Sequence, residues 1–206
     1  MIDGVHIWRA ALDEDGWPGP EGLPPEDRQR AEKFLRKEVA RRWVAARWAL
    51  RRALSLYLGR PATEIELELG EHGKPQLRDE ERGLQFNLTH SAGLALVAVT
   101  ERCPVGIDVE MIAPREGLVA LAERALPPEE AATVRAADPS RQLGVFYTAW
   151  VRHEALVKCL GTGLGSAPPP SPLAVEPIEV GPGYAAAVAV ADARVGPLDC
   201  RSLRAG

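Results

Sequence analysis

Cysteine is scarce in the 206-residue chain, and long apolar runs are absent. The three cysteines, Cys103, Cys159 and Cys200, are far apart and form no Cys-x-x-Cys pair. The spacing therefore suggests neither a disulfide framework nor a zinc knuckle, and we expect a reducing, cytoplasmic environment. No apolar segment reaches the roughly 20 residues of a membrane-spanning helix. The first ten residues, which include Asp3, lack the apolar stretch of a signal peptide.

A general excess of positive charge is also absent. The 25 Lys and Arg residues face 29 Asp and Glu residues, which gives a net charge of −4 and disfavours binding to long nucleic acids. The charge is unevenly distributed, however. Residues 28–60 contain eleven Lys or Arg and two Glu, a net +9, so the rest of the chain carries −13. This basic segment indicates a local anion site.

The pattern of apolar residues predicts an α+β protein. Apolar side chains from Phe34 or Leu35 to Tyr57 recur at spacings of three and four, which predicts one long helix that ends at Gly59. Residues 13–25 are rich in glycine and proline and are expected to form a loop. Alternating apolar patterns predict strands at residues 2–8, 64–69, 84–88 and 94–100.

The second half repeats this order of elements. A strand at residues 105–110 precedes predicted helices at 117–126, 128–137 and 139–160 and predicted strands at 174–180, 184–191 and 198–203. Asp138 and Pro139 are suited to begin the third helix, and Gly161 to end it. We therefore predict an α+β fold of two similar subdomains related by pseudo-two-fold symmetry, at residues 1–103 and 104–206.

Asp108 and Glu110 form the sharpest local feature. Both lie on one face of the strand predicted at 105–110, roughly 6–7 Å apart at about 3.3 Å per residue. Their repulsion is relieved where a cation lies between them, and carboxylate oxygens are suited to Mg²⁺. A solvated strand face is the alternative reading.

Glu154 and Lys158 lie on one stripe of the third predicted helix, together with Phe146 and Trp150. In one reading, Glu154 and Lys158 form a surface ion pair. In the other, Glu154 is a third carboxylate for the metal and Lys158 is a cation that contacts a phosphate. His90 ends the segment Phe86-Asn87-Leu88-Thr89-His90 and could bind phosphate, transfer a proton or be structural. HExxH, GxSxG and P-loop motifs are absent from the chain.

These motifs, in their order, resemble the 4′-phosphopantetheinyl transferases. The resemblance rests on Gly73-Lys74-Pro75, residues 86–91, Gly106-Ile107-Asp108-Val109-Glu110, and Trp150, Glu154, Lys158, Gly161 and Gly163. It covers residues 26–164 and looks like the Sfp-type branch, whose members are monomers of two pseudo-symmetric halves with the active site between them. His153 departs from the pattern, because the family usually has Lys before the catalytic Glu.

The resemblance implies a Mg²⁺-dependent reaction. Coenzyme A would donate its 4′-phosphopantetheine arm to a serine hydroxyl of an acyl or peptidyl carrier protein, with release of 3′,5′-ADP. Asp108, Glu110 and Glu154 would hold Mg²⁺, and Glu154 or a carboxylate-held water would deprotonate the serine. The carrier could serve fatty-acid, polyketide or non-ribosomal-peptide synthesis. A non-catalytic relative that binds coenzyme A or a carrier protein is the alternative.

The resemblance also implies the remaining site residues. Lys158 and His90 would contact phosphates and stabilise developing charge, so that Asp108, His90, Glu154 and Lys158 form the catalytic group. Coenzyme A would be held by Arg30, Arg42, Lys74, Thr89, His90 and Lys158. Structural ion pairs with the acidic strands are the alternative role for Arg47 and Arg51. Glu130 lies where the family often has a further acid.

Overall fold

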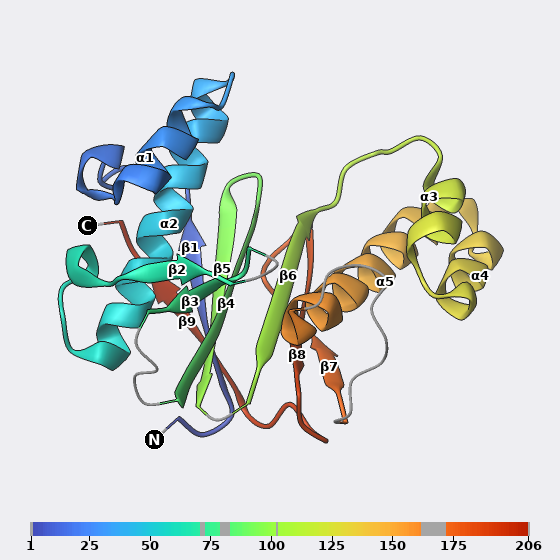
Figure 1. The fold of residues 1–206 in the computed structure, drawn as a ribbon. Helices are drawn as coiled ribbons and strands as arrows, with labels where there is room; N and C mark the ends of the chain where they lie inside the picture. The colour runs from blue at the N-terminus through green and yellow to red at the C-terminus, as the bar shows by residue number, and fades with distance from the viewer. Residues whose placement is uncertain (1, 71–72, 79–82, 102, 162–171, 206) are drawn as a thin grey trace.

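Two β-sheets lie between two long helices in the computed structural model, which describes residues 2–70, 73–78, 83–101, 103–161 and 172–205 (Figure 1). The first sheet has the order β4-β5-β1-β9. Its strands are β1 (Val5–Ala11), β4 (Leu84–Ser91), β5 (Leu94–Glu101) and β9 (Leu198–Leu203). The second sheet has the order β6-β8-β7, with β6 (Val105–Met111), β7 (Ala174–Pro177) and β8 (Tyr184–Val190). β2 (Leu67–Leu69) and β3 (Pro75–Leu77) form a separate antiparallel pair.

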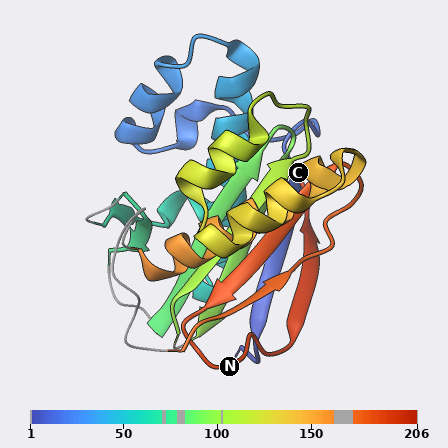
Figure 2. The ribbon, with the colours of Figure 1, turned by 90° about the vertical axis from the view of Figure 1, so that its right-hand side faces the viewer.

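Each sheet is covered on its outer face by one long helix. Helix α2 (Lys37–Leu58) packs Leu50 and Leu54 against the first sheet, and α5 (Pro139–Leu160) lies across the second sheet (Figure 2). The inner faces of the sheets share one core, which includes Ile7 of β1 and Ile107 of β6. Full burial of such a side chain contributes about 1.5–3 kcal/mol. These two sheet-and-helix halves confirm the predicted α+β fold.

The prediction of one helix from Phe34 onward is wrong at its beginning. Two helices occupy this region, α1 (Pro25–Glu32) and α2, and residues 33–36 connect them outside either helix. Arg36 has an extended backbone, with φ −103° and ψ 120°. Leu35 is fully exposed, whereas a core stripe would bury it. Periodicity counts every apolar residue as a core residue, and here two of them belong to a surface connection.

Most other predicted elements appear within a few residues of their expected bounds. The helices of the second half are α3 (Leu118–Ala125), α4 (Pro128–Ala136) and α5, and the Asp138 carboxylate caps α5 by accepting the Ser140 N–H at 2.8 Å. The strand predicted at 64–69 is shorter, because Ala62–Glu64 forms a 3₁₀ turn. Within the described residues, no helix has both the length and the apolar character needed to cross a membrane.

The last strand does not stay with the second half. β9 pairs in parallel with β1, with Val5 opposite Leu198, and so becomes the outer strand of the first sheet. β9 belongs to the subdomain predicted at residues 104–206 by its position in the sequence. Its hydrogen bonds, however, join it to the sheet of the first half. Pairing between strands almost 200 residues apart leaves no local sequence signal.

Candidate active site

β4 and β6, one edge strand from each sheet, are joined by side chains rather than by a backbone ladder. Three backbone N–H groups of β6 donate to side chains of β4. The Ile107 N–H donates to the Asn87 side-chain carbonyl at 3.0 Å, and the Val109 N–H donates to the Thr89 hydroxyl at 3.4 Å. The Met111 N–H donates to the Ser91 hydroxyl at 3.1 Å. These residues alternate along each strand, so they share one side of it. We call this β4–β6 junction the seam.

Asp108 lies in the middle of the seam and is 3% exposed. Its Oδ1 pairs with the Lys158 ammonium and accepts a hydrogen bond from the Thr89 hydroxyl at 3.1 Å. Its Oδ2 is buried and has no hydrogen-bond partner among the described residues. Burial raises the pKa of Asp108, although the Lys158 charge acts in the opposite direction. The carboxylate thus has one oxygen engaged and one available.

Gly106 explains how Lys158 reaches Asp108. A Cβ at Gly106 would lie 2.1 Å from the Ala155 carbonyl oxygen and 2.2 Å from the Cys159 nitrogen. Only a residue without a side chain allows β6 and α5 to approach this closely. The glycine of the Gly106-Ile107-Asp108-Val109-Glu110 motif therefore places the last turns of α5 against the strand that carries the acids.

Glu110 lies one step further along the seam. Its carboxylate accepts a hydrogen bond from the Ser91 hydroxyl at 2.8 Å. Burial raises the pKa of Glu110 most strongly, and the negative charges of Asp108 and Glu154 raise it further. The three predicted metal ligands therefore share one electrostatic neighbourhood.

These acids fit a hard cation in their chemistry, although they do not form a closed ligand set. In the described part of the chain, no group of three or more His, Cys, Asp or Glu side chains has the arrangement of a metal site. The unpartnered Asp108 Oδ2 and the carboxylates of Glu110 and Glu154 are nevertheless the oxygen donors that Mg²⁺ prefers.

His90 lies on β4 between Thr89 and Ser91. Its side chain is exposed on the surface, yet enough protein surrounds the ring to disfavour the charged form. This desolvation and the positive charge of Lys158 lower the pKa of His90. The ring is therefore neutral at pH 7 and offers one N–H donor.

Arg42 is engaged by a carboxylate that the sequence analysis did not identify. Its Nε and Nη2 donate to the two oxygens of Asp13 at 2.9 and 2.7 Å, and Arg41 donates to the same side chain at 2.7 Å. Glu38 also pairs with Arg42 at 2.7 Å. These contacts raise the pKa of Arg42 and lower that of Asp13.

The Asp13–Arg42 pair lies near one end of the seam. A Cβ at Gly93, in the turn after β4, would lie 2.6 Å from the Asp13 carboxylate. Tyr184, which is close enough to interact electrostatically with Arg42, is the cross-strand partner of Met111. Asp13 is separated from Arg42 by 29 residues; the only sequence signal is an acidic loop that could face a basic helix.

The other predicted binding residues have varied surroundings. Arg30 stacks over the Trp43 ring at 5.9 Å and lines a surface groove of about 450 Å³ that includes Glu26 and Lys33. The Lys74 ammonium is bonded to backbone carbonyls. That Arg30 and Lys74 hold coenzyme A stays a prediction. Gly163 of the last motif lies outside the described residues.

Arg47 and Arg51 form structural ion pairs, which was the alternative role predicted for them from the sequence. Both pair with Asp27 of α1, at 3.1 and 3.2 Å, in a buried cluster. Desolvation lowers the pKa of Arg51 to about 10. Their partner is a helical aspartate rather than the acidic strands that the sequence suggested.

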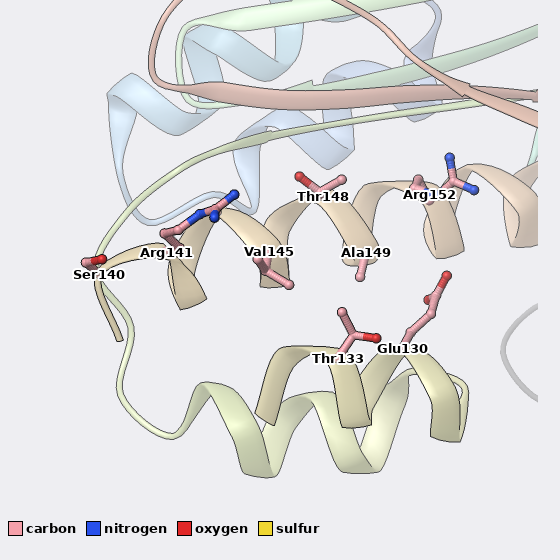
Figure 3. A pocket seen from close by; sticks show the side chains of 9 residues that line it. Glu130, Thr133, Ser140, Arg141, Val145, Thr148, Ala149 and Arg152 are labelled. Atoms are coloured by element: carbon pink, nitrogen blue, oxygen red, sulfur yellow. The ribbon is translucent and has the colours of Figure 1, made fainter. Parts of the chain in front are cut away.

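A groove of about 580 Å³ lies between α4 and α5, and none of the residues that line it is a predicted catalytic residue. Val145 and Ala149 of α5 point toward Thr133 and Glu130 of α4 (Figure 3). The Glu130 Oε2 atom is buried and lacks a hydrogen-bond partner among the described residues. No residue that lines this groove belongs to the seam.

Known proteins resemble this chain over about four fifths of its length. Residues 104–193 match the family model of the 4′-phosphopantetheinyl transferase superfamily, and residues 19–102 match the model named 4′-phosphopantetheinyl transferase, N-terminal. The 4′-phosphopantetheinyl transferase HetI of a Nostoc species is 35% identical over 174 residues, which cover 80% of this chain and 71% of HetI. A 4′-phosphopantetheinyl transferase of Bacillus subtilis is 31% identical, with 79% and 71% covered. The transferase Sfp of Bacillus subtilis strain 168 is 28% identical, with the same shares covered.

Proposed function

The chain belongs to the 4′-phosphopantetheinyl transferase superfamily, and from that premise we propose that the seam between β4 and β6 is its active site. The family resemblance predicted from the sequence is confirmed. The protein is an enzyme that transfers phosphopantetheine to carrier proteins. The single observation that carries the proposed site is the buried Asp108 carboxylate, with Lys158 and Thr89 on one oxygen and an unpartnered second oxygen.

Asp108, Glu110 and Glu154 are the residues that would hold Mg²⁺. Burial, and after it the repulsion by Asp108 and Glu154, raises the pKa of Glu110. This repulsion supports the assignment, because a divalent cation relieves it. When bound, the ion neutralises negative charge on the pyrophosphate of coenzyme A. Because Lys158 pairs with Oδ1 of Asp108, Oδ2 is left to bind the ion.

The transfer itself requires positioning and charge stabilisation more than covalent chemistry by the protein. The serine oxygen of the carrier bonds to the phosphorus attached to pantetheine, while the bond from that phosphorus to the bridging oxygen breaks and 3′,5′-ADP leaves. Glu154, or a water held by a carboxylate, takes the serine proton. The ammonium of Lys158 and the neutral N–H of His90 are donors for the charge that develops on the phosphate. The Thr89 hydroxyl orients Asp108. We also assign Thr89 to the residues that would hold coenzyme A.

Arg42 and Arg30 are proposed to bind the nucleotide phosphates. Arg42 is supported more strongly, because it lies near the Glu110 end of the seam and already binds the carboxylate of Asp13 bidentately. A phosphate offers the same planar arrangement of two oxygens to a guanidinium. Arg30 and Lys33 border a groove of about 450 Å³ on the same basic segment.

We propose that the enzyme acts as a cytoplasmic monomer. Its acceptor is the serine of an acyl or peptidyl carrier protein from fatty-acid, polyketide or non-ribosomal-peptide synthesis. The two halves already meet along the seam within one chain, so a second copy is not needed to assemble the site.

The proposed site is tested by the mass of the carrier. The protein is mixed with coenzyme A, Mg²⁺ and several apo carrier proteins, and mass spectrometry measures the gain of phosphopantetheine. Glu154→Gln is expected to lower the rate by at least about a hundredfold. The matched control is Glu129→Gln, an exposed residue of α4 that is expected to keep the wild-type rate. Equal rates for the two variants would show that Glu154 has no part in the reaction.

A further inference from the structure

Lys74 connects the two halves of the molecule through backbone atoms. Its ammonium donates one hydrogen bond to the Val105 carbonyl and one to the Lys158 carbonyl, both at 2.9 Å. Val105 is the first residue of β6, and Lys158 lies in the last turn of α5. One side chain of the first half thus binds two elements of the second half.

The backbone of Lys74 is itself fixed. Its carbonyl accepts the Gly70 N–H at 2.9 Å, and Gly73 before it has a φ of +76°, which favours glycine. Pro75 after it restricts Lys74 to an extended conformation. Lys74 therefore extends from a backbone that is bonded to Gly70 and directly precedes β3.

The two carbonyls are suitable partners for a half-buried cation. The last four carbonyls of a helix lack partners within it, and the negative end of the helix dipole favours a positive charge there. Burial lowers the pKa of Lys74, so the ammonium needs these acceptors to compensate for lost water. Two of its three N–H donors are used by them.

The segments that Lys74 ties together carry the reactive side chains. Lys158 contributes its carbonyl to Lys74 and its ammonium to Asp108 and Thr89, whose hydroxyl is 3.4 Å away. Val105 lies three residues before Asp108 on β6. A displacement of the end of α5 along β6 would separate the Lys158 ammonium from Asp108.

We propose that Lys74 is a positioning residue, which fixes the Lys158 ammonium against Asp108 by holding the end of α5 to the start of β6. This inference rests on the proposed function of the seam. It differs from the role in coenzyme A binding that the family resemblance implies, because the Lys74 ammonium is directed at protein carbonyls. A misplacement of about 1 Å in such a site lowers a rate by as much as about a hundredfold.

The test compares Lys74→Met, which removes the donors, with Lys74→Arg, which keeps them. Transfer to one apo carrier is measured by mass spectrometry at varied coenzyme A concentration, calorimetry gives the Kd for coenzyme A, and thermal unfolding reports stability. Arg78→Met is the matched control, because Arg78 lies beside β3, is exposed and pairs only with Glu66 among the described residues. We expect Lys74→Met to lower kcat at least about tenfold with an unchanged Kd, and Lys74→Arg to recover most of the loss.

Three results would overturn the proposal. An unchanged kcat with a raised Kd would make Lys74 a coenzyme A contact, and unchanged values of both would give it no role. If Lys74→Met and Lys74→Arg lose kcat equally, and the loss is proportional to the decrease in unfolding temperature, the role of Lys74 is only structural. If Lys74→Met does not fold, Lys74→Gln, which retains an amide donor, is judged by the same criteria. Absence of transfer by the wild-type protein would instead count against the proposed function.

Discussion

The Thr89 hydroxyl and the Asp108 carboxylate are bonded across the seam, at 3.1 Å, while the same hydroxyl oxygen lies 3.4 Å from the Val109 N–H. Thr89 therefore both completes the backbone hydrogen bonding of β6 and orients the acid beside it. The same residue accepts a hydrogen bond from Lys158. Attachment of the two halves and assembly of the site thus depend on the same side chain.

Asp108→Asn is expected to lower the transfer rate strongly while the fold is kept. The amide still accepts from Thr89, and Lys158, with 30% of its side chain exposed, can be solvated after the charge is lost. We expect a rate at least about a hundredfold lower and a stability loss of about 1 kcal/mol. Carrier mass and urea unfolding measure the two effects. Asp192→Asn, at an exposed residue, is the control, and a wild-type rate for Asp108→Asn would contradict the proposed site.

Asp13→Asn is expected to strengthen coenzyme A binding. The Asp13 carboxylate competes with phosphate for the guanidinium of Arg42, so its neutralisation leaves more positive potential for the ligand. Calorimetry at low salt should give a Kd roughly two- to fivefold lower, and the gain should shrink as salt is added. Asp15→Asn, an exposed neighbour, controls for long-range charge. Weaker binding by Asp13→Asn would mean that Asp13 orients Arg42 instead.

Gly106→Ala is expected to destabilise the protein and to lower the transfer rate. Its new methyl group would collide with the Ala155 carbonyl and the Cys159 nitrogen, so α5 must move away from β6. Such overpacking costs about 1–3 kcal/mol. Gly144→Ala, in an exposed and open part of α5, should instead stabilise by about 0.5–1 kcal/mol. Thermal unfolding of the two variants should therefore shift in opposite directions.

Asp27→Asn is expected to cost about 3–5 kcal/mol of folding stability, because it leaves two buried guanidinium groups without their shared carboxylate. Arg51→Met should cost less. The Nε and Nη1 of Arg51 already lack hydrogen-bond partners among the described residues, and the Asp27–Arg47 pair remains. Urea unfolding of both variants measures the difference, and a larger loss in Arg51→Met would exclude this explanation.

His6 is expected to make the protein less stable in acid. Burial, and next the charge of Arg201, lower its pKa below the ordinary 6.5, and its Nδ1 lies 2.9 Å from the Tyr57 hydroxyl, to which Trp8 donates at 2.8 Å. The folded state favours neutral His6, so the lowered pKa contributes to the free energy of unfolding. This contribution is fully present above pH 6.5 and declines as the pH falls below that value.

His6→Gln should therefore show a smaller loss of stability than the wild type on acidification. Urea unfolding at about pH 8 and at about pH 5 measures the difference between the two proteins, which cancels the contribution of other groups. An identical pH dependence would show that His6 is not responsible.

Local features of the chain were predictable from the sequence. The alternation that places Asp108 and Glu110 on β6, and the Asp138–Pro139 start of α5, are signals contained in a few consecutive residues. They are read correctly because backbone period and capping act over such distances. The resemblance to the family rested on these same segments.

Contacts between distant segments were not predictable in this way. The pairing of Asp13 with Arg42 and the two carbonyls that Lys74 binds join segments whose sequences carry no sign of each other. The exposure of Leu35 has a similar cause, because its chemistry favours a core and only the tertiary fold places it outside. Hydrophobic burial is non-directional. An apolar pattern therefore predicts that a helix forms better than it predicts which segments the helix packs against.

The parallel pairing of β9 with β1 bears on how the protein is made. A ribosome releases residues 1–103 first, and β1 then has a free edge, which is a template for pairing with other chains. At about 5–20 residues per second, β9 follows β5 after roughly 5–20 seconds. During this interval the charge of Arg9, which is exposed on β1, is a feature of the strand that opposes such pairing.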